Sequence, residues 1–129
     1  MSLQPPLSYR WLRANGVARL VPWHFIDESE GRFASLQFAK EHPGAGELFT
    51  FARRQDCDDF AGFRIVGGRV GDEVIYYHPS FQGSLNPHII SGRYPDLWAF
   101  LRDVVLLDTA MWLTGEEDID DITKRSVSS

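Results

Sequence analysis

The chain of 129 residues has little of three things that define specialised protein classes: cysteine, long apolar runs and positive charge. Its one cysteine, Cys57, excludes an internal disulfide framework and suits a reducing compartment, so we expect a cytoplasmic location. The longest apolar stretch, residues 104–113, is short and interrupted by Asp108, so we expect no membrane span. The net charge of −5 argues against a phosphate-neutralising surface, so we expect no nucleic-acid partner.

The length and the ordinary composition are those of one globular domain, with 43% hydrophobic, 24% charged and a generous 13% aromatic residues. Residues 1–21 have no basic segment followed by an apolar run, so we expect no signal peptide. We predict a single domain over residues 1–122 and a flexible tail over residues 123–129.

The hydrophobic periodicity changes along the chain and predicts a fold of the α+β class. A serine and a glycine bracket a short helix at residues 8–15, and residues 29–43 fit helix and strand templates about equally well. Glycines between two later strands indicate a hairpin. The predicted strands are residues 48–52, 60–66, 73–78 and, more briefly, 88–90.

The last predicted helix, residues 95–113, is apolar over more than half of its circumference. One face carries Leu97, Leu101, Val104, Val105 and Trp112. Three further leucines (Leu106, Leu107 and Leu113) widen it, so we expect this helix to be covered on more than one side.

Asp108 falls near the middle of that apolar face. A buried carboxylate is costly unless it is paired or hydrogen-bonded. We therefore interpret Asp108 as a structural buried polar group that accepts bonds from an arginine, a tyrosine or a backbone amide. The alternative is an acid with a raised pKa, which requires a cleft beside it.

Motifs that carry chemistry are hard to find in this sequence. The four histidines lack the spacing of a zinc site, and the carboxylates around Cys57 would raise the pKa of its thiol. The glycine-rich residues 67–71 are followed by a strand and not by a helix, so they form a turn and not a phosphate loop. We predict no catalytic, cofactor-binding or metal-binding residue.

Three polar or aromatic segments are candidates for contact with another protein. Asp56, Asp58 and Asp59 lie in the most polar loop between two predicted strands, where functional residues concentrate. Tyr76 and Tyr77 are adjacent on a strand, so one must face away from the other, and an exposed tyrosine is a favoured interface anchor. The acidic segment that begins with Glu116 and Glu117 is a third candidate contact.

The order of the segments resembles the SUKH superfamily over about residues 20–113. The resemblance rests on loose hydrophobic patterns, among them a short helix before PWH, a phenylalanine-alanine strand, an Asp-rich loop and an aromatic-led last helix. The expected N-terminal helix with leucine-proline and asparagine-glycine signals is shortened or replaced, with Asn15-Gly16 as its remnant. The matching segments are residues 22–24 (PWH), 47–53 (ELFTFAR), 60–63 (FAGF), 74–78 (VIYYH) and 94–101 (YPDLWAFL).

The resemblance implies a twisted, mainly antiparallel sheet with helices packed against it, and a non-enzymatic role. Members include bacterial immunity proteins that block toxins and fungal regulators of cell-wall glucan synthesis. We therefore expect an immunity-type module that neutralises a protein partner, such as a basic toxin or nuclease domain, by occluding its active surface. One alternative is a small-ligand-binding or hydrolytic domain with a cleft near Asp108 and the histidines. Another is a self-associating structural or regulatory module that uses Leu106 and Leu113.

Overall fold

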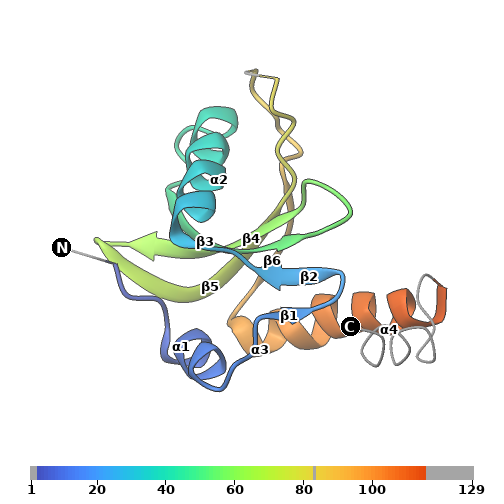
Figure 1. The fold of residues 1–129 in the computed structure, drawn as a ribbon. Helices are drawn as coiled ribbons and strands as arrows, with labels where there is room; N and C mark the ends of the chain where they lie inside the picture. Colours follow the sequence, from blue (N-terminus) through green and yellow to red (C-terminus); the bar gives the residue numbers. More distant parts are fainter. Residues whose placement is uncertain (1–2, 83, 116–129) are drawn as a thin grey trace.

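The computed structural model describes residues 3–82 and 84–115, and their fold is an antiparallel sheet with helices on both faces (Figure 1). The six strands are hydrogen-bonded in the order in which they follow along the chain. The strands are β1 (Arg19–Leu20), β2 (Trp23–Phe25), β3 (Glu47–Arg54), β4 (Phe60–Val66), β5 (Arg69–Tyr77) and β6 (Ile90–Tyr94). The α+β class and the antiparallel sheet predicted from the sequence are confirmed.

The helices divide between the two faces of the sheet. α2 (Glu28–Glu41) covers one face, while α1 (Leu7–Ala14) and the C-terminal helices cover the other (Figure 1). The C-terminal helices are α3 (Leu97–Phe100), a π-helical segment (Leu101–Val105) and α4 (Leu106–Gly115), which follow one another without a break. The predicted tail, residues 123–129, and the predicted domain boundary at residue 122 lie outside the described residues.

Helix boundaries follow from capping side chains. The Asp27 carboxylate accepts a hydrogen bond from the Glu30 backbone N–H at 2.8 Å, which fixes the start of α2 and decides the ambiguous segment in favour of helix. Asp96 caps α3 in the same way through the Ala99 N–H at 2.8 Å. The last helix therefore begins at Leu97, two residues after the predicted Pro95. Residues up to Tyr94 belong to β6, and Asp96 is the cap.

The β4–β5 hairpin is tighter than predicted. Gly67 and Gly68 both have positive φ (58° and 76°), the combination that a two-residue type I′ turn requires. Arg69 therefore already pairs with Val66, and β5 starts four residues before the predicted Glu73. The predicted β4, residues 60–66, is confirmed at both ends.

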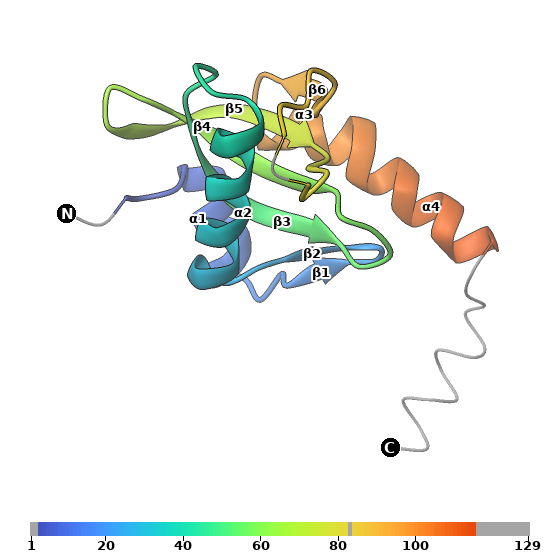
Figure 2. The same ribbon diagram turned by 90° about the horizontal axis from the view of Figure 1, so that it is seen from above.

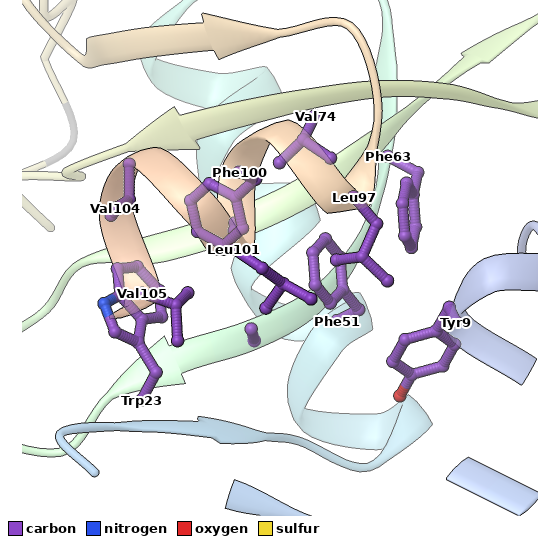
Figure 3. Close-up of a cluster of buried hydrophobic side chains, with 12 residues drawn as sticks. Tyr9, Trp23, Phe51, Phe63, Val74, Leu97, Phe100, Leu101, Val104 and Val105 are labelled. Carbon is purple, nitrogen blue, oxygen red and sulfur yellow. The ribbon is translucent and has the colours of Figure 1, made fainter. Parts of the chain in front are cut away.

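Two hydrophobic clusters hold the layers together, one on each face of the sheet. The cluster under α2 joins that helix to alternate positions of the strands, among them Phe60, Ile75 and Tyr77. The cluster on the opposite face joins Tyr9 of α1 and Phe100 of α3 to the other set of strand positions (Figure 3). Because both faces are covered, the central strands are apolar on both sides.

The last helix leaves the sheet as it proceeds. Its first part, including the predicted Leu97, Leu101, Val104 and Val105, is buried. α4 extends beyond the edge of the sheet (Figure 2), and its leucines at 106, 107 and 113 are exposed. The expectation that this helix is covered on more than one side is wrong for α4 in the described part of the chain, because no described layer packs on its outer side.

Candidate interaction surface

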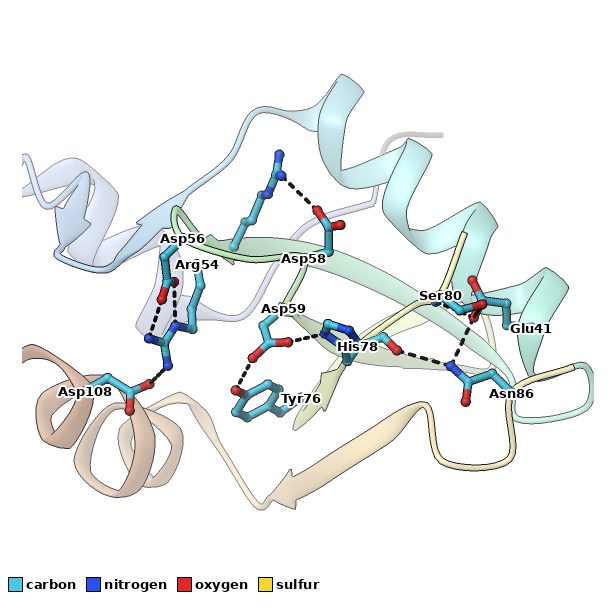
Figure 4. A network of polar contacts seen from close by, with 11 residues as sticks. Glu41, Arg54, Asp56, Asp58, Asp59, Tyr76, His78, Ser80, Asn86 and Asp108 are labelled. Carbon is cyan, nitrogen blue, oxygen red and sulfur yellow. Dashed lines mark hydrogen bonds and ion pairs between the residues drawn. The ribbon is translucent and has the colours of Figure 1, made fainter. Parts of the chain in front are cut away.

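Many polar side chains of the described residues gather at one end of the central strands, where β3 ends and β4 begins (Figure 4). We call this surface the loop edge; it comprises the β3–β4 loop (residues 55–59), residues 78–82 and 84–89 between β5 and β6, and the adjoining surface of α2. Neighbouring groups of hydrogen bonds and ion pairs, together called its network, lie along it from Asp108 on α4 to Glu41 on α2. It contains all three loop aspartates proposed from the sequence.

Arg54, the last residue of β3, connects the loop to α4. Its guanidinium donates two hydrogen bonds to the Asp56 carboxylate, both of 2.9 Å, and lies 3.3 Å from Asp108 Oδ2. The hydrogen bonds from Arg54 hold the pKa of Asp56 below its ordinary value. The Trp23 indole N–H donates to the same Asp108 oxygen at 2.8 Å. Asp108 thus has the arginine partner expected of a structural carboxylate, although its side chain is 22% exposed and lies at the margin of the core.

Asp59 joins β5 to the same loop. It accepts a hydrogen bond from the Tyr76 hydroxyl at 2.5 Å, and its other oxygen lies 2.5 Å from His78 Nδ1. Burial raises the pKa of Tyr76, and the bond to Asp59 raises it further. The Tyr76 ring is half-buried against Trp23 and Phe100, so it braces the loop and offers little surface to a partner.

The prediction that Tyr77 is an anchor for a partner is wrong. Its ring is fully buried against Phe38 of α2, and its hydroxyl lies 2.7 Å from Thr50 Oγ1. The two tyrosines do point to opposite faces, as adjacent strand residues must. Neither becomes an exposed anchor, because helices cover both faces of the sheet.

Asp58 is the most exposed of the three loop aspartates, with half of its side chain accessible. Its carboxylate pairs with Arg53 at 3.0 Å, and the same guanidinium reaches Glu30 of α2 at 3.1 Å. The guanidinium carbon also lies 5.5 Å from the centre of the Phe60 ring. Arg53 therefore connects the acidic loop to α2.

Glu41, in the last turn of α2, is the least expected member of the network. Only 1% of the residue is exposed, yet its carboxylate accepts hydrogen bonds from the backbone N–H groups of Ser80 (2.7 Å) and Phe81 (3.1 Å). The amides of Asn86 (3.2 Å) and Gln37 (2.8 Å) donate to it as well. Burial alone would raise the pKa of Glu41, but these hydrogen bonds outweigh burial and lower it to about 2.

The Glu41 bonds determine where Phe81 points. Phe81 has φ of 59°, a left-handed conformation that costs a non-glycine residue about 1 kcal/mol or more. In this conformation its ring stacks on that of Phe33 of α2, with 6.2 Å between the ring centres. Phe33, Phe81 and the neighbouring Leu36 are all exposed. We call these three residues the aromatic patch.

No sequence pattern predicts this patch. Phe33 and Leu36 lie in residues 29–43, which fit helix and strand templates about equally well, and Phe81 lies between two predicted strands. A buried glutamate is equally hard to foresee, because its hydrogen-bond donors are about 40 residues away along the chain. One available signal was Glu41 itself, which lies on the buried side of a helix with apolar neighbours three and seven residues before it, Phe38 and Ala34.

In the described part of the chain, Asp108 does not meet a histidine as a hydrolytic site there would need. Within residues 3–82 and 84–115, no hydrogen bond or ion pair joins Asp108 to His24, His78 or His88. The carboxylate–histidine pair that does form, Asp59–His78, has no described hydroxyl or thiol bonded to the second ring nitrogen.

Other reactive or metal-binding groups do not converge either. Burial, reinforced by Asp59, raises the pKa of the Cys57 thiol to about 11, so it is a poor nucleophile. The described histidines, cysteine and carboxylates include no group of three placed to hold a metal ion.

A groove of about 350 Å³ lies elsewhere, between α2 and β3. Its lining is mainly apolar, with Glu28 and Arg32 on the α2 side. Its two hydroxyls, on Ser35 and Thr50, lie 2.7 Å apart and are hydrogen-bonded to each other. The polar groups of the groove are therefore two hydroxyls bonded to each other and the charged side chains of Glu28 and Arg32.

Two sequence-based predictions remain without structural description, because Glu116 and Glu117 lie outside the described residues. None of the helices in the described part has the length and apolar character needed to cross a bilayer. Comparison of the chain with family models, with curated proteins and with solved structures found no match.

Proposed function

We propose that the chain is a protein-binding module that contacts its partner with the loop edge. The observation that carries the proposal is the aromatic patch, an exposed phenylalanine pair held in place by the buried carboxylate of Glu41. Exposed aromatic side chains are enriched at the energetic centres of protein interfaces.

The patch is preorganised, which favours binding. The β5–β6 loop is fixed at its start by the bonds of Ser80 and Phe81 to Glu41, and near its end by those of Asn86. Residues that such bonds already hold in place lose little conformational entropy when a partner binds. Holding Phe81 in a left-handed conformation to reach Phe33 has a cost in stability that contact with a partner would explain.

The charge of the loop edge favours a basic partner. Its network contains six carboxylates and only two guanidinium groups, those of Arg53 and Arg54. The local excess is therefore negative even though most of the carboxylates are hydrogen-bonded. The carboxylates are those of Glu30, Glu41, Asp56, Asp58, Asp59 and Asp108. Such an excess steers a basic protein towards the surface and repels a second copy of the same surface.

The resemblance to the SUKH superfamily makes toxin neutralisation the first function to test. An immunity protein of this kind would place the aromatic patch over the active surface of a basic toxin or nuclease domain. The contact would bury about 1,600 Å² in total, the usual size of a specific complex. The acidic loop residues would then act at the rim and the phenylalanine pair at the centre.

The experiment is growth rescue and co-purification with the toxin-like product of a neighbouring gene. We expect the wild-type chain to restore growth, and Phe33→Ala combined with Phe81→Ala to weaken binding more than about tenfold. Val66→Thr is the matched control, because Val66 is exposed on the β4–β5 hairpin at the far end of the sheet (Figure 2). Binding that is equal in all three chains would reject the loop edge as the contact surface. If the wild-type chain neither restores growth nor co-purifies with the toxin-like protein, that result counts against the immunity function.

A further inference from the structure

The distribution of polarity around α4 is the reverse of that of an ordinary surface helix. Asp108 is the only ionisable residue of α4, and it points inward to Trp23 and Arg54. Thr109 also faces inward, where its hydroxyl donates to the Leu20 carbonyl at 3.3 Å. Asp108 and Thr109 therefore attach the helix to β1, β2 and β3, with the half-buried Trp112 on the same inward side. The outward side is apolar except for Thr114, whose hydroxyl donates to the carbonyls of Ala110 and Met111 in its own helix.

The outward side chains form two rows along the helix. Leu107 and Met111 are one helical turn apart in the first row, and Leu106, Ala110 and Leu113 form the second. The exposed fractions of the four large side chains are 51% for Leu106, 58% for Leu107, 72% for Met111 and 47% for Leu113. We call these five residues the α4 face.

The size of the α4 face is that of apolar patches that often serve as contact surfaces. From these exposed fractions its area is roughly 400–500 Å², which equals the largest apolar patch of a typical monomer and is often functional. Two such faces pressed together would bury about 900 Å², just below the range of stable specific complexes. That area fits an association that is weak and depends on concentration.

The lack of charge on the α4 face points to a second copy of this chain as its occupant. In a twofold dimer each residue meets the same surface of the other copy, so any charge near the axis would face its own kind. The α4 face has none, and the nearest charges on the preceding turn, Arg102 and Asp103, neutralise each other at 2.7 Å. The loop edge differs, because its negative excess would face itself.

We propose that the α4 faces of two copies pack antiparallel about a twofold axis. The axis passes between Leu107 and Met111, so that Leu107 of each copy contacts Met111 of the other. Leu106 and Leu113 flank this contact, and the two helices, each about 15 Å long, overlap along their length. This association is independent of the proposed function, because it uses a different surface.

Sedimentation velocity of the full chain between about 5 and about 500 µM tests the dimer. We expect half of the chains to be associated at about 100 µM. Leu107→Glu and Met111→Lys should each leave the chain monomeric over this range. An equimolar mixture of the two variants should restore the dimer, because the antiparallel pairing places the introduced carboxylate opposite the introduced ammonium. Val66→Lys, on the remote hairpin, is the control and should associate like the wild type.

The outcomes separate the possible occupants of the α4 face. A wild-type mass that stays monomeric at every concentration overturns the proposal, as do charge variants that associate normally. A mixture that fails to associate overturns the antiparallel pairing. If the wild type is monomeric and Leu107→Glu abolishes binding to the toxin-like partner, the face belongs to that partner and not to a second copy. Circular dichroism of each variant shows that a lost dimer is not a lost fold.

Discussion

The loop edge and the α4 face both expose apolar side chains, but they differ in what holds those side chains in place. At the loop edge a buried carboxylate and a left-handed backbone hold the Phe81 ring against that of Phe33. On α4 the helix supplies the geometry, and one inward-facing aspartate attaches it to the sheet. The comparison shows that apolar side chains can be exposed by two different kinds of local structure. In the two proposals, the charge around each surface is what assigns one to a different protein and the other to a second copy of this chain.

The largest effect should come from removing the group on which the loop edge depends. Glu41→Ala leaves the N–H groups of Ser80 and Phe81 without their acceptor and removes one of the two acceptors of the Asn86 amide. We expect a loss of about 3 kcal/mol in the free energy of unfolding, measured with urea. Glu47→Ala, at the exposed start of β3, is the control and should cost less than about 0.5 kcal/mol. A loss below about 1 kcal/mol at Glu41 would show that the loop is ordered by other contacts.

Acid should weaken the loop edge through the same residue. The folded pKa of Glu41 is about 2 and its ordinary value is 4.5, so the charged form is the one that folding favours. Its contribution is complete above about pH 4.5 and is lost as the pH falls towards 2. It amounts to about 3 kcal/mol, because one pKa unit corresponds to about 1.4 kcal/mol.

Glu41→Gln isolates this contribution, because glutamine keeps the shape and loses the titration. The stability difference between wild type and variant should be constant above about pH 5 and shrink below it. As a control, the stability of Met111→Ser, on the uncharged α4 face, should differ from that of the wild type by the same amount at every pH. A constant difference between wild type and Glu41→Gln down to pH 2 would refute the assignment of acid sensitivity to Glu41.

A smaller effect is expected where α4 is attached to the sheet. Asp108→Asn keeps an acceptor for the Trp23 indole but removes the charge that faces Arg54. We expect a loss of about 1–2 kcal/mol in stability and faster hydrogen exchange of α4 amides, with the β5–β6 loop unaffected. Unchanged exchange in α4 would show that hydrophobic contacts alone hold the helix.

The smallest effects on stability should come from the two exposed surfaces themselves. Phe81→Gly removes a ring contact but relieves the left-handed backbone, and Met111→Lys exchanges one exposed side chain for another. Both should change stability by less than about 1 kcal/mol. They should differ in function, since the first should weaken partner binding and the second self-association. A variant that impairs both would show that the surfaces act together.

Local patterns predicted the parts of the fold that depend on local periodicity. The strand predicted over residues 60–66 matches β4 at both ends, and the helical period of residues 97–105 matches the buried part of the last helix. The apolar helix face around Asp108 also predicts a paired structural carboxylate, and its partner Arg54 is an arginine, one of the residue types expected. These predictions succeed because the residue pattern within one strand or helix is enough to make them.

The sequence by itself therefore determined the class of fold, the central strands and the lack of a recognisable catalytic motif. Only the tertiary structure decided which apolar residues are covered. Tyr77 is buried because α2 packs on a face that the strand pattern leaves open, and Glu41 is buried because its donors come from a distant loop. Met111 is exposed because α4 runs past the edge of the sheet. Periodicity records which side chains share a face, but whether that face meets another layer depends on contacts between segments far apart in the chain.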